Sequence, residues 1–454
     1  MTDNKIKKKR GWEFWIDRGG TFTDVVACTP RGHLKTLKLL SENPGQYQDA
    51  AVYGIQKFLS ALKSHVREVD SVKMGTTVAT NALLQHRGEP TLLVITEGFR
   101  DALRIGYQER PDIFALDIRL PEMLYKEVTE VKERISAKGE IIRSLDEEAL
   151  QNSLIAALDR GINSVAIILL HGYRFPQHEK RAAILARQLG FKQVSVSHEP
   201  SPLMKFVTRA DTTLMDAYLS PVLDRYVSDV RSGLNNILET SPLMFFMQSH
   251  GGLARADHLR GKDSVLSGPA GGVVGMVQTA TSAGFEKLIG FDMGGTSTDV
   301  SLFEGHYERT DSALIGGVRV TAPMMQIHSI AAGGGSILKY ESSRLQVGPE
   351  SAGAFPGPAC YRNSGPITVT DANVYLGRIQ GEFFPKTFGE NSNQPIDTGI
   401  VKKRFSTLAK EVEKSTKIKV SPHDIANGFL RIAIEKMSNA IKKVSVQRGH
   451  DVTE

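Results

Sequence analysis

The chain has 454 residues, of which 41% are hydrophobic and 23% are charged, a composition that excludes a disordered or fibrous protein. At this length, roughly two to four domains are expected. The sequence contains neither a secretory signal nor an apolar stretch long enough to span a bilayer, and its two cysteines, Cys28 and Cys360, cannot form a disulfide framework. These features predict a soluble protein of the reducing cytoplasm.

Much of the net charge of +6 lies at the N-terminus, where residues 5–10 supply five basic side chains. A block of like charges at a chain end repels itself and stays solvated. We therefore predict a basic, disordered leader over residues 1–11, with neither nucleic acid nor a membrane as partner.

One motif occurs twice, as W-I-D-R-G-G-T-F-T-D-V-V at 15–26 and as G-F-D-M-G-G-T-S-T-D-V-S at 290–301. With Asp17 aligned on Asp292, seven of the nine positions from Asp17 to Val25 recur. Each copy follows a short apolar run, its glycine pair permits a tight turn, and its remainder alternates as a returning strand does. The sequence thus predicts two hairpins, each with an aspartate where the first strand ends.

Small residues and threonine hydroxyls at such a turn let backbone N–H groups approach a phosphate, while the aspartate can hold a magnesium ion with its water shell. A single copy could equally be an ordinary turn, because short motifs often occur without function. The repetition favours a pair of phosphate sites.

Between the two hairpins, strands alternate with helices. The segment 70–84 predicts a strand, a turn and a helix, and its Thr76 and Thr77 either form an anion site at the helix N-terminus or cap that helix. Further strands are expected at 91–96, 164–170 and 194–196, and helices after the capping-box pair Ser144 and Glu147 and at 178–189. This alternation predicts an α/β fold.

The second half contains less regular glycine-rich segments. A long helical segment at about 208–238 leads to a strand at 242–247 and to His250, which is either catalytic or paired locally. The run S-G-P-A-G-G-V-V-G at 267–275 enters a helix but does not match a dinucleotide fingerprint. Three successive glycines at 333–335 predict either a close approach of a ligand to the backbone or a hinge.

These motifs resemble those of the actin, hexokinase and heat-shock-chaperone ATPase superfamily, and more narrowly those of the hydantoinase A, acetone carboxylase and 5-oxoprolinase family. The segments that carry the resemblance lie at 17–25, 74–84, 98–101, 267–275, 291–300, 331–337 and 347–361. The pattern at 106–118, followed by that at 121–128, is most similar to the N-terminal part of an ATP-dependent 5-oxoprolinase.

The resemblance implies an α/β fold of the actin/hexokinase-like (ribonuclease H-like) type, with duplicated domains and a nucleotide cleft between them. It implies an N-terminal hydantoinase/oxoprolinase-type domain at 12–205. A hydantoinase A-type domain would follow at 206–454 and would be incomplete at its C-terminal end.

The implied reaction is the ATP-dependent opening of a cyclic amide, in which 5-oxo-L-proline, ATP and water give L-glutamate, ADP and phosphate. A lactam carbonyl is a poor electrophile, and phosphorylation of its oxygen would let water attack the carbon. Within the family, the alternatives are an ATP-dependent hydantoinase and a ketone carboxylase subunit. Outside it, the alternatives are an actin-like or chaperone-like ATP-driven binding module and an inactive remnant.

The resemblance also implies roles for individual residues. Asp17 and Asp292 would hold magnesium and serve in catalysis, Asp292 by polarising an attacking oxygen. Asp24 and Asp299 would either join them or tie each returning strand to a neighbour. The phosphates of ATP would lie against Gly19, Gly20, Thr21, Thr23, Gly294, Gly295, Thr296, Thr298, Gly333, Gly334 and Gly335. The lactam would contact residues among Thr76, Thr77, Asn81, Arg100, Arg110 and His250.

In one respect the sequence departs from the family. The final helix begins after the N-cap Ser421 and is followed by Gly449. The adenosine-binding glycine motif of the superfamily is expected beyond this helix, but the sequence stops at Glu454 without it. We therefore expect a second subunit or a further C-terminal module as partner, in a homo-oligomer or a hetero-oligomer.

Overall fold

The computed structural model describes residues 11–43, 45–60, 68–108, 114, 116–118, 120, 122–315, 317–389 and 393–452. Of the predicted leader, only Gly11 falls within these residues, and its amide donates a hydrogen bond of 3.1 Å to Asp70 Oδ2. Arg110 lies outside them. In the described part of the chain, no helix is long and apolar enough to cross a membrane.

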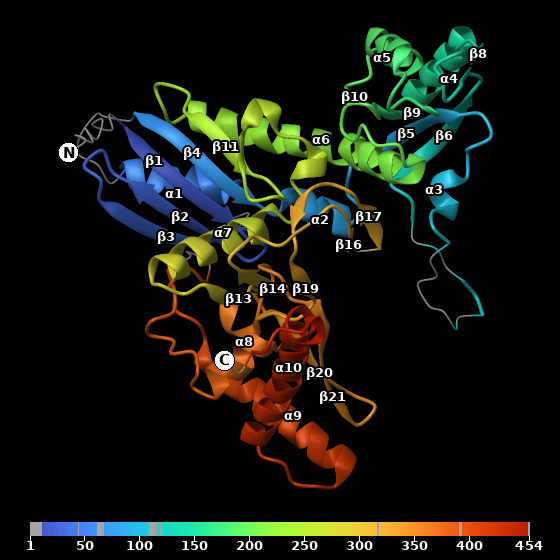
Figure 1. Cartoon of the computed structure of the whole chain (residues 1–454). Coiled ribbons are helices and arrows are strands. Elements are labelled where there is room, and N and C mark those ends of the chain that lie inside the picture. The colour runs from blue at the N-terminus through green and yellow to red at the C-terminus, as the bar shows by residue number, and fades with distance from the viewer. Residues whose placement is uncertain are drawn as a thin grey trace.

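The first sheet contains the first copy of the motif, and its strands lie in the order β12-β11-β4-β1-β2-β3 (Figure 1). Their bounds are β1 Trp12–Arg18, β2 Phe22–Cys28, β3 Leu34–Leu40, β4 Val69–Thr76, β11 Leu243–Met247 and β12 Leu253–Arg255. The first three form an antiparallel meander, whereas β4 runs parallel to β1 and β11 runs parallel to β4. The carboxyl ends of β1 and β4 therefore lie side by side.

Helices α1 (Ala50–Ser60) and α6 (Phe206–Asn235) share one apolar core with this sheet. Phe14 and Ile16 of β1 are buried in that core because alternate side chains of a strand point to the same face. The segment 206–255, placed in the second domain from the sequence, supplies α6, β11 and β12 to the first sheet and its core.

A second sheet has the order β10-β9-β5-β6, with parallel neighbours, and forms a separate α/β layer. Its elements are β5 Thr91–Thr96, β6 Tyr125–Val131, β9 Ser164–Ile168, β10 Gln193–Val196, α4 Glu147–Asp159 and α5 Gln177–Leu189. The predicted βα alternation is confirmed here. The cap of α4 is Asp146, which accepts a hydrogen bond from Ala149 N at 3.1 Å, rather than Ser144.

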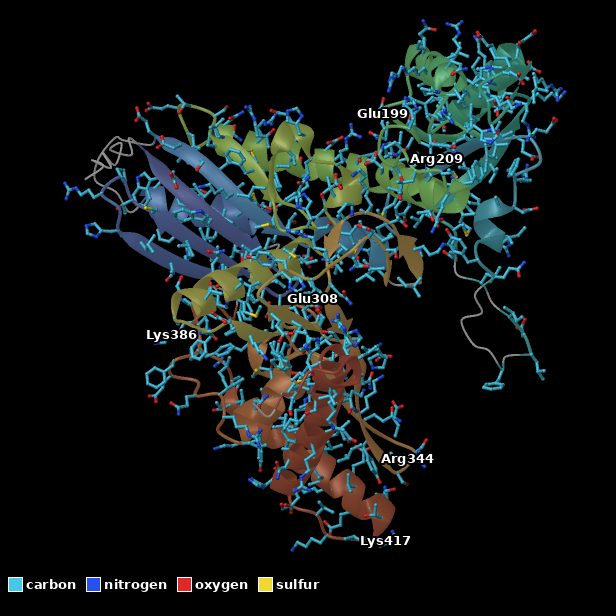
Figure 2. The ribbon with its side chains drawn as sticks, in the orientation of Figure 1. Glu199, Arg209, Glu308, Arg344, Lys386 and Lys417 are labelled. Carbon is cyan, nitrogen blue, oxygen red and sulfur yellow. The ribbon has the colours of Figure 1, made fainter. Side chains whose placement is uncertain are left out.

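Arg209, near the start of α6, joins this layer to the long helix (Figure 2). Its guanidinium is fully buried and donates to the carbonyl oxygens of Leu169 at 2.7 Å and Leu203 at 3.1 Å. It also lies over the rings of Tyr173 and Phe206, as cation–π pairs do. This side chain therefore connects the end of β9 with the start of α6.

The second half contains a three-stranded antiparallel arrangement of order β13-β14-β19 in its described part. Its main elements are α7 Ser267–Ser282, β13 Lys287–Met293, β14 Thr298–Glu304, β19 His328–Ile330, α8 Val369–Tyr375, α9 Thr398–Thr416 and α10 Pro422–Val444. Figure 1 shows α7 between the first sheet and β13. The predicted N-cap Ser421 is confirmed, since its side chain accepts from Asp424 N at 3.1 Å.

The shorter elements complete the connections between these layers. They are α2 Val78–Leu84, α3 Ala102–Ile105, β7 Arg134–Ile135, β8 Ile141–Arg143, β15 Arg309–Thr310, β16 Ala313–Ile315, β17 Val318–Val320, β18 Met324–Met325, β20 Ser336–Glu341 and β21 Arg344–Ser351. Helices α8, α9 and α10 share a second apolar core with β20 and β21.

Candidate active site

Both predicted hairpins are present, and they have the same register. In the first, Asp17 near the end of β1 lies opposite Asp24 of β2. In the second, Asp292 near the end of β13 lies opposite Asp299 of β14. Each hairpin thus presents an aspartate from each strand beside its turn.

The two turns also close in the same way. Gly19 N donates a hydrogen bond to Phe22 O at 3.0 Å, and Gly294 N donates to Ser297 O at 2.9 Å. These are equivalent positions of the repeated motif. The motif therefore specifies the backbone of the turn in both places.

The tips of the hairpins contact each other reciprocally. A Cβ atom built on Gly295 would lie 1.9 Å from Thr21 Oγ1, and one built on Gly20 would lie 3.4 Å from Thr296 Oγ1. Each threonine thus packs against a glycine of the other hairpin. In the described part of the chain, Thr21 Oγ1 is buried without a hydrogen-bond partner, so this junction contains a hydroxyl that a polar ligand would satisfy.

The two leading aspartates interact electrostatically across the junction. The pKa of Asp17 is raised to about 6, and the largest cause is desolvation of its carboxylate by the surrounding protein atoms. Part of the residue nevertheless remains exposed to solvent. The negative charges of Asp24 and Asp292 raise the pKa further, while Lys38 opposes them. The Asp17 anion is therefore destabilised near neutral pH, and a bound cation would relieve the repulsion.

Helix α7 passes both aspartates with a face made of glycines. A Cβ atom on Gly268 would lie 3.9 Å from Asp17 Oδ1, and one on Gly272 would lie 3.6 Å from Asp292 Oδ2. Because these positions carry no side chain, space remains beside both carboxylates. The sequence analysis assigned no role to this glycine run. The signal was its spacing, because Gly268 and Gly272 are four residues apart and therefore lie on one face of a helix.

The second aspartate of each hairpin is tied to a neighbouring strand. Asp24 accepts from Lys38 Nζ of β3 at 2.6 Å, and Asp299 accepts from the hydroxyl of Ser329 on β19. Burial raises the pKa of Asp299, the charge of Asp292 raises it as well, and the hydrogen bond from Ser329 lowers it. Of the two expected roles, these contacts match that of a tie between strands.

Thr23 and Thr298 face the interior rather than a phosphate. Thr23 Oγ1 shares a hydrogen bond of 3.0 Å with Ser41 Oγ, and Thr298 Oγ1 donates to Ala332 O at 2.6 Å. Both threonines are fully buried. Successive side chains of a strand point to opposite faces, and these two threonines lie on the interior face. Their hydroxyls bond to protein atoms there, whereas a contact with phosphate was expected from the sequence.

The glycine loop 333–335 supports the second hairpin. Gly334 N donates to Gly294 O at 2.9 Å, and Gly335 N donates to Gly295 O at 2.6 Å. These amides, expected at the phosphates, are thus engaged by the hairpin turn. Two of the glycines are needed for the close approach, since a Cβ atom on Gly333 would lie 2.8 Å from Gly294 O and one on Gly335 would lie 2.8 Å from Gly295 O.

Two of the expected lactam residues, Thr76 and Thr77, lie near Asp17, and a third, Asn81, contacts Thr77. Thr76 and Thr77 follow the point where Gly75 pairs with Asp17 in the parallel register of β4 and β1, and Asn81 lies one turn into α2. Thr76 is buried, Thr77 is half-buried and Asn81 is exposed. Thr77 Oγ1 donates to Arg18 O at 3.3 Å and accepts from Asn81 Nδ2 at 3.4 Å, so the two side chains are joined to the end of β1.

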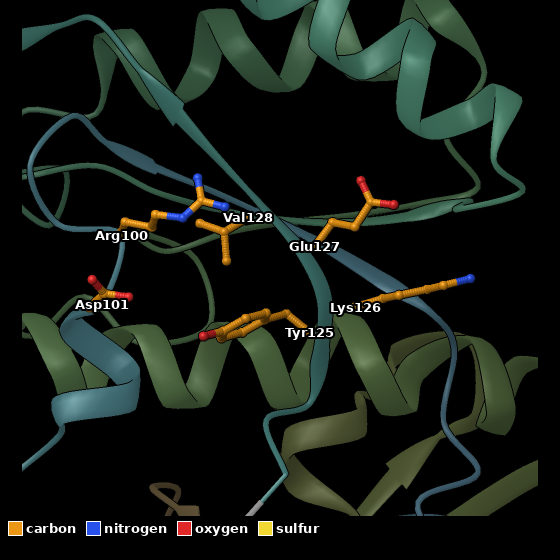
Figure 3. Close-up of a pocket in the computed structure, with 6 residues that line it drawn as sticks. All are labelled: Arg100, Asp101, Tyr125, Lys126, Glu127 and Val128. Carbon is orange, nitrogen blue, oxygen red and sulfur yellow. The ribbon is translucent and has the colours of Figure 1, made fainter.

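Arg100 lies in a different place, in a pocket of about 370 Å³ on the small α/β layer (Figure 3). The lining residues are Arg100, Asp101, Tyr125, Lys126, Glu127 and Val128. In Figure 3, Arg100, Asp101 and Tyr125 lie together on one side, while Lys126 and Glu127 extend to the other. None of these belongs to the hairpins, so Arg100 is not brought to the twin aspartates.

His250 pairs locally, which was one of its two expected roles. Its Nε2 lies 2.9 Å from Gln248 Oε1, and Gly252 N donates to its Nδ1 at 3.3 Å. Both ring nitrogens are thus engaged within one turn after β11.

The donor set at the junction suits magnesium better than a metal caged by protein. Among the described residues, no group of three or more His, Cys, Asp and Glu side chains is arranged to hold a metal. Asp17 and Asp292 supply carboxylates from two strands, and magnesium commonly combines one or two carboxylates with water and substrate phosphates. The unpartnered Thr21 hydroxyl and the glycine face of α7 fit such a phosphate-bearing ligand.

Comparison with known proteins places both halves in one family. A model for hydantoinase/oxoprolinase matches residues 209–454, and a model for the hydantoinase/oxoprolinase N-terminal region matches residues 13–190. The chain is 42% identical to 5-oxoprolinase 1 of Arabidopsis thaliana over an alignment 476 residues long, which covers 96% of this chain and 37% of that protein.

Two solved structures have the same fold. Nucleotide-free acetone carboxylase matches with a TM-score of 0.80 and 21% identity over 96% of this chain and 63% of its own. The ATP-dependent caprolactamase of Pseudomonas jessenii matches with a TM-score of 0.74 and 30% identity over 97% of this chain and 64% of its own. The expected actin-like α/β fold is confirmed. Since the matches extend across both motif hairpins, the chain belongs to the hydantoinase/oxoprolinase family.

Proposed function

We propose that this chain is part of an ATP-dependent cyclic amide hydrolase whose substrate is 5-oxo-L-proline, opened to L-glutamate with release of ADP and phosphate. The observation that carries the proposal is the pair Asp17 and Asp292, presented by two equivalent hairpins whose tips touch. The similarity to a 5-oxoprolinase and to an ATP-dependent caprolactamase supports a cyclic amide as substrate.

The residues of the junction would orient the triphosphate. Asp17 and Asp292 would hold magnesium through oxygen or water, and the turn residues around Thr21 and Thr296 would direct backbone N–H groups toward phosphate. Magnesium, when bound, would neutralise charge on the transferred phosphoryl group. The raised pKa of Asp17 supports this assignment, because two adjacent carboxylates at neutral pH favour a cation between them.

The lactam would be placed on the β4 side of Asp17. Thr77 follows the position paired with Asp17 and contacts Asn81, whereas Arg100 lies in the separate pocket of the small α/β layer. We therefore retain the first two as substrate-side candidates. The position of the lactam oxygen near Asp17 would bring it within reach of the phosphoryl group, which is the geometric requirement for its activation.

In this proposal, the chain is active only together with a further polypeptide. The chain spans 37% of the Arabidopsis relative and 64% of the caprolactamase chain. A further polypeptide would supply the remaining parts of the enzyme, including an adenosine site. We place the assembly in the cytoplasm because the two cysteines of this chain, Cys28 and Cys360, are both free and buried.

A reconstituted assay tests the proposal. The chain is mixed with the portion of Arabidopsis 5-oxoprolinase 1 that it does not cover, and ADP release is measured with 5-oxoproline, caprolactam, hydantoin or acetone. We expect 5-oxoproline to stimulate ATP hydrolysis most strongly. Stimulation by another of these compounds alone would replace the substrate assignment.

The role of the twin aspartates is tested in the same assay. Asp292→Asn should lower ATP turnover by about two orders of magnitude or more, because several kcal/mol of charge stabilisation are lost. Asp257→Asn is the control, since Asp257 is exposed and pairs with Arg231 on the surface at 2.8 Å. Unchanged turnover in a folded Asp292→Asn variant would refute the site.

A further inference from the structure

The pocket on the small α/β layer contains charged groups that the proposed reaction does not use. Its volume of about 370 Å³ lies at the small end of the range for ligand pockets, so it suits a small metabolite better than a nucleotide. Arg100 and Asp101 come from the segment after β5, whereas Tyr125 and Val128 come from β6 (Figure 3). The pocket thus combines a loop that carries two charges with a strand that carries a ring and an aliphatic side chain.

Three polar side chains of this pocket keep their bonding capacity. Among the described residues, the side chains of Arg100 and Asp101 form neither a hydrogen bond nor an ion pair, and Asp101 does not cap α3, although it stands at the N-cap position. The Tyr125 hydroxyl also has no hydrogen-bond partner in that part of the chain. In Figure 3, Arg100 and Asp101 extend in different directions rather than toward each other. A cation, an anion and a hydroxyl are therefore available to one ligand.

Tyr125 shows that the pocket is partly shielded from water. The residue is half-buried and its ring packs against the main core. Burial raises the pKa of its hydroxyl, while the charge of Arg104 lowers the pKa, that of Asp101 raises it and that of Arg100 lowers it. These three charges therefore act on one phenol. Polar contacts are stronger where water is partly excluded than on an open surface.

The charges that remain after internal pairing define the complementary ligand. The lining cations are Arg100 and Lys126, and the lining anions are Asp101 and Glu127. Glu127 is already neutralised, because Arg160 donates to its two carboxylate oxygens at 2.8 and 2.6 Å. Two cations then remain with one unpaired carboxylate. A matching ligand carries two negative groups and one positive group.

The loop that carries Arg100 is held in place by the protein itself. Gly98 N donates to Glu130 Oε1 of β6 at 2.7 Å. The next side chain, Phe99, packs against Phe206 of α6, with 5.1 Å between the ring centroids. A guanidinium on a fixed backbone loses less conformational freedom when it binds a ligand than one on a mobile loop does. The support of this loop therefore favours a binding role over that of a freely moving surface charge.

We propose that this pocket binds a small acidic α-amino acid. Arg100 and Lys126 would each pair with one of the two carboxylates, and Asp101 would accept hydrogen bonds from the ammonium group. The ring of Tyr125 and the side chain of Val128 would contact the carbon chain between the charged groups.

The identity of the natural ligand follows from the chemistry of the reaction, and it rests on the proposed function. 5-Oxo-L-proline carries one carboxylate, and its amide nitrogen has no positive charge. Opening of the lactam frees an amine and a second carboxylate, which are the groups that the pocket recognises. The pocket therefore distinguishes the product from the substrate, and L-glutamate is the acidic amino acid that the proposed reaction releases.

Calorimetric titration of the whole chain, in the absence of ATP, tests the ligand class. L-Glutamate should bind with a Kd of about 1 mM or below. Glutarate and 5-oxo-L-proline lack the ammonium group, and both should bind at least about tenfold more weakly. Failure of L-glutamate to bind at about 10 mM overturns the proposal. Glutarate or 5-oxo-L-proline binding as tightly as L-glutamate overturns it as well.

Variants of the two charged groups test the assigned contacts. Arg100→Gln should weaken the binding of L-glutamate at least about tenfold, because a charge-assisted pair with a carboxylate is lost. Asp101→Asn should weaken the binding of L-glutamate but not that of glutarate, since glutarate has no ammonium group. Arg187→Gln is the control and should bind as the native chain does, because Arg187 is exposed at the end of α5 in the same layer.

Circular dichroism checks that each variant is folded, and Arg100→Lys replaces Arg100→Gln if the latter is not, with a loss in the same direction expected. A folded Arg100 variant with native affinity contradicts the proposal. An Asp101→Asn variant that weakens both ligands equally also contradicts it, because a merely structural role would have that effect.

This test and the test of the proposed function fail separately. Binding is measured on the chain alone, so a reconstituted mixture that hydrolyses no ATP leaves the affinity for L-glutamate unchanged. Conversely, a reconstituted mixture that opens 5-oxoproline, together with a chain that does not bind L-glutamate, overturns only the assignment of the pocket.

Discussion

The first and second hairpins share their turn but differ in what holds them. In the first, Ser41 bridges the returning strand to the turn by bonding Thr23 Oγ1 at 3.0 Å and Gly19 O at 2.7 Å. In the second, backbone takes that role, since Thr298 bonds a carbonyl and the loop 333–335 donates to the turn. A motif of eight or nine residues therefore specifies the turn, while its supports come from elsewhere in the chain.

The same contrast extends to burial. The apolar residues ahead of the first aspartate lie in the main core, whereas those ahead of the second are partly exposed at a sheet edge. Equivalent sequence thus gives a fixed strand on one side of the junction and an incompletely covered strand on the other. The largest expected effects are those that compare equivalent positions of the two strands.

Truncation of an isoleucine in each strand gives the largest difference. Ile16→Ala should lower the free energy of unfolding by about 2–5 kcal/mol, because Ile16 is buried in the core. Ile289→Ala should lower it by no more than about 1 kcal/mol, because Ile289 is partly exposed. Urea titrations of the two variants measure both values. Equal losses would show that β13 is covered in solution by the chain itself.

The contact between the hairpin tips gives a second, smaller asymmetry. Gly295→Ala would place a methyl group 1.9 Å from Thr21 Oγ1, and should cost about 1–3 kcal/mol of stability. Gly20→Ala should cost less, since its methyl group would meet Thr296 at 3.4 Å. Thermal unfolding of both variants checks this order.

A double variant shows whether Thr21 is responsible. In a Thr21→Gly background, Gly295→Ala should cost less than it does in the native chain, because the clashing atoms have been removed. An unchanged cost in this background would mean that the tips do not touch in solution.

The smallest expected effect is a pH dependence from Asp17. Its pKa of about 6 in the folded chain exceeds the ordinary value of 3.8, so the folded state binds the proton more tightly than the unfolded state does. Stability contributed by this group is therefore present at low pH and is lost as the pH rises through about 6. Asp17→Asn should be more stable than the native chain at pH 7.5, and this advantage should shrink at pH 4.5.

Urea midpoints at the two pH values measure the effect. A pH-independent difference between Asp17→Asn and the native chain would show that the Asp17 carboxylate is not perturbed. The junction would then lack the charge repulsion that favours a cation there.

Features set by neighbouring residues could be predicted well. The two hairpins, the strand at 91–96 and the cap of α10 at Ser421 follow from glycine pairs, apolar runs and capping side chains. Two predictions of this kind differ from the structure. The N-cap of α4 is Asp146 rather than Ser144, and the side chains of Thr23 and Thr298 point into the interior. In a strand, a shift of one position reverses the face, so the role of a single threonine is decided by packing.

Features set by distant residues could not be predicted. The pairing of β11 with β4, the crossing of Gly268 and Gly272 over the two aspartates, and the distance of Arg100 from them all join segments far apart in the sequence. Loop 333–335 is similar, because its amides have acceptors only once the second hairpin lies beside it.

The sequence by itself determined two turns with aspartates beside them, because glycine conformation and strand alternation act over a few residues. The tertiary structure decided that the tips interlock through Thr21 and Gly295, and that α7 leaves both carboxylates open. It also decided that β1 is enclosed while β13 keeps a bare edge. Burial and charge repulsion depend on which distant segments pack together, and a pattern of neighbouring residues does not determine that packing.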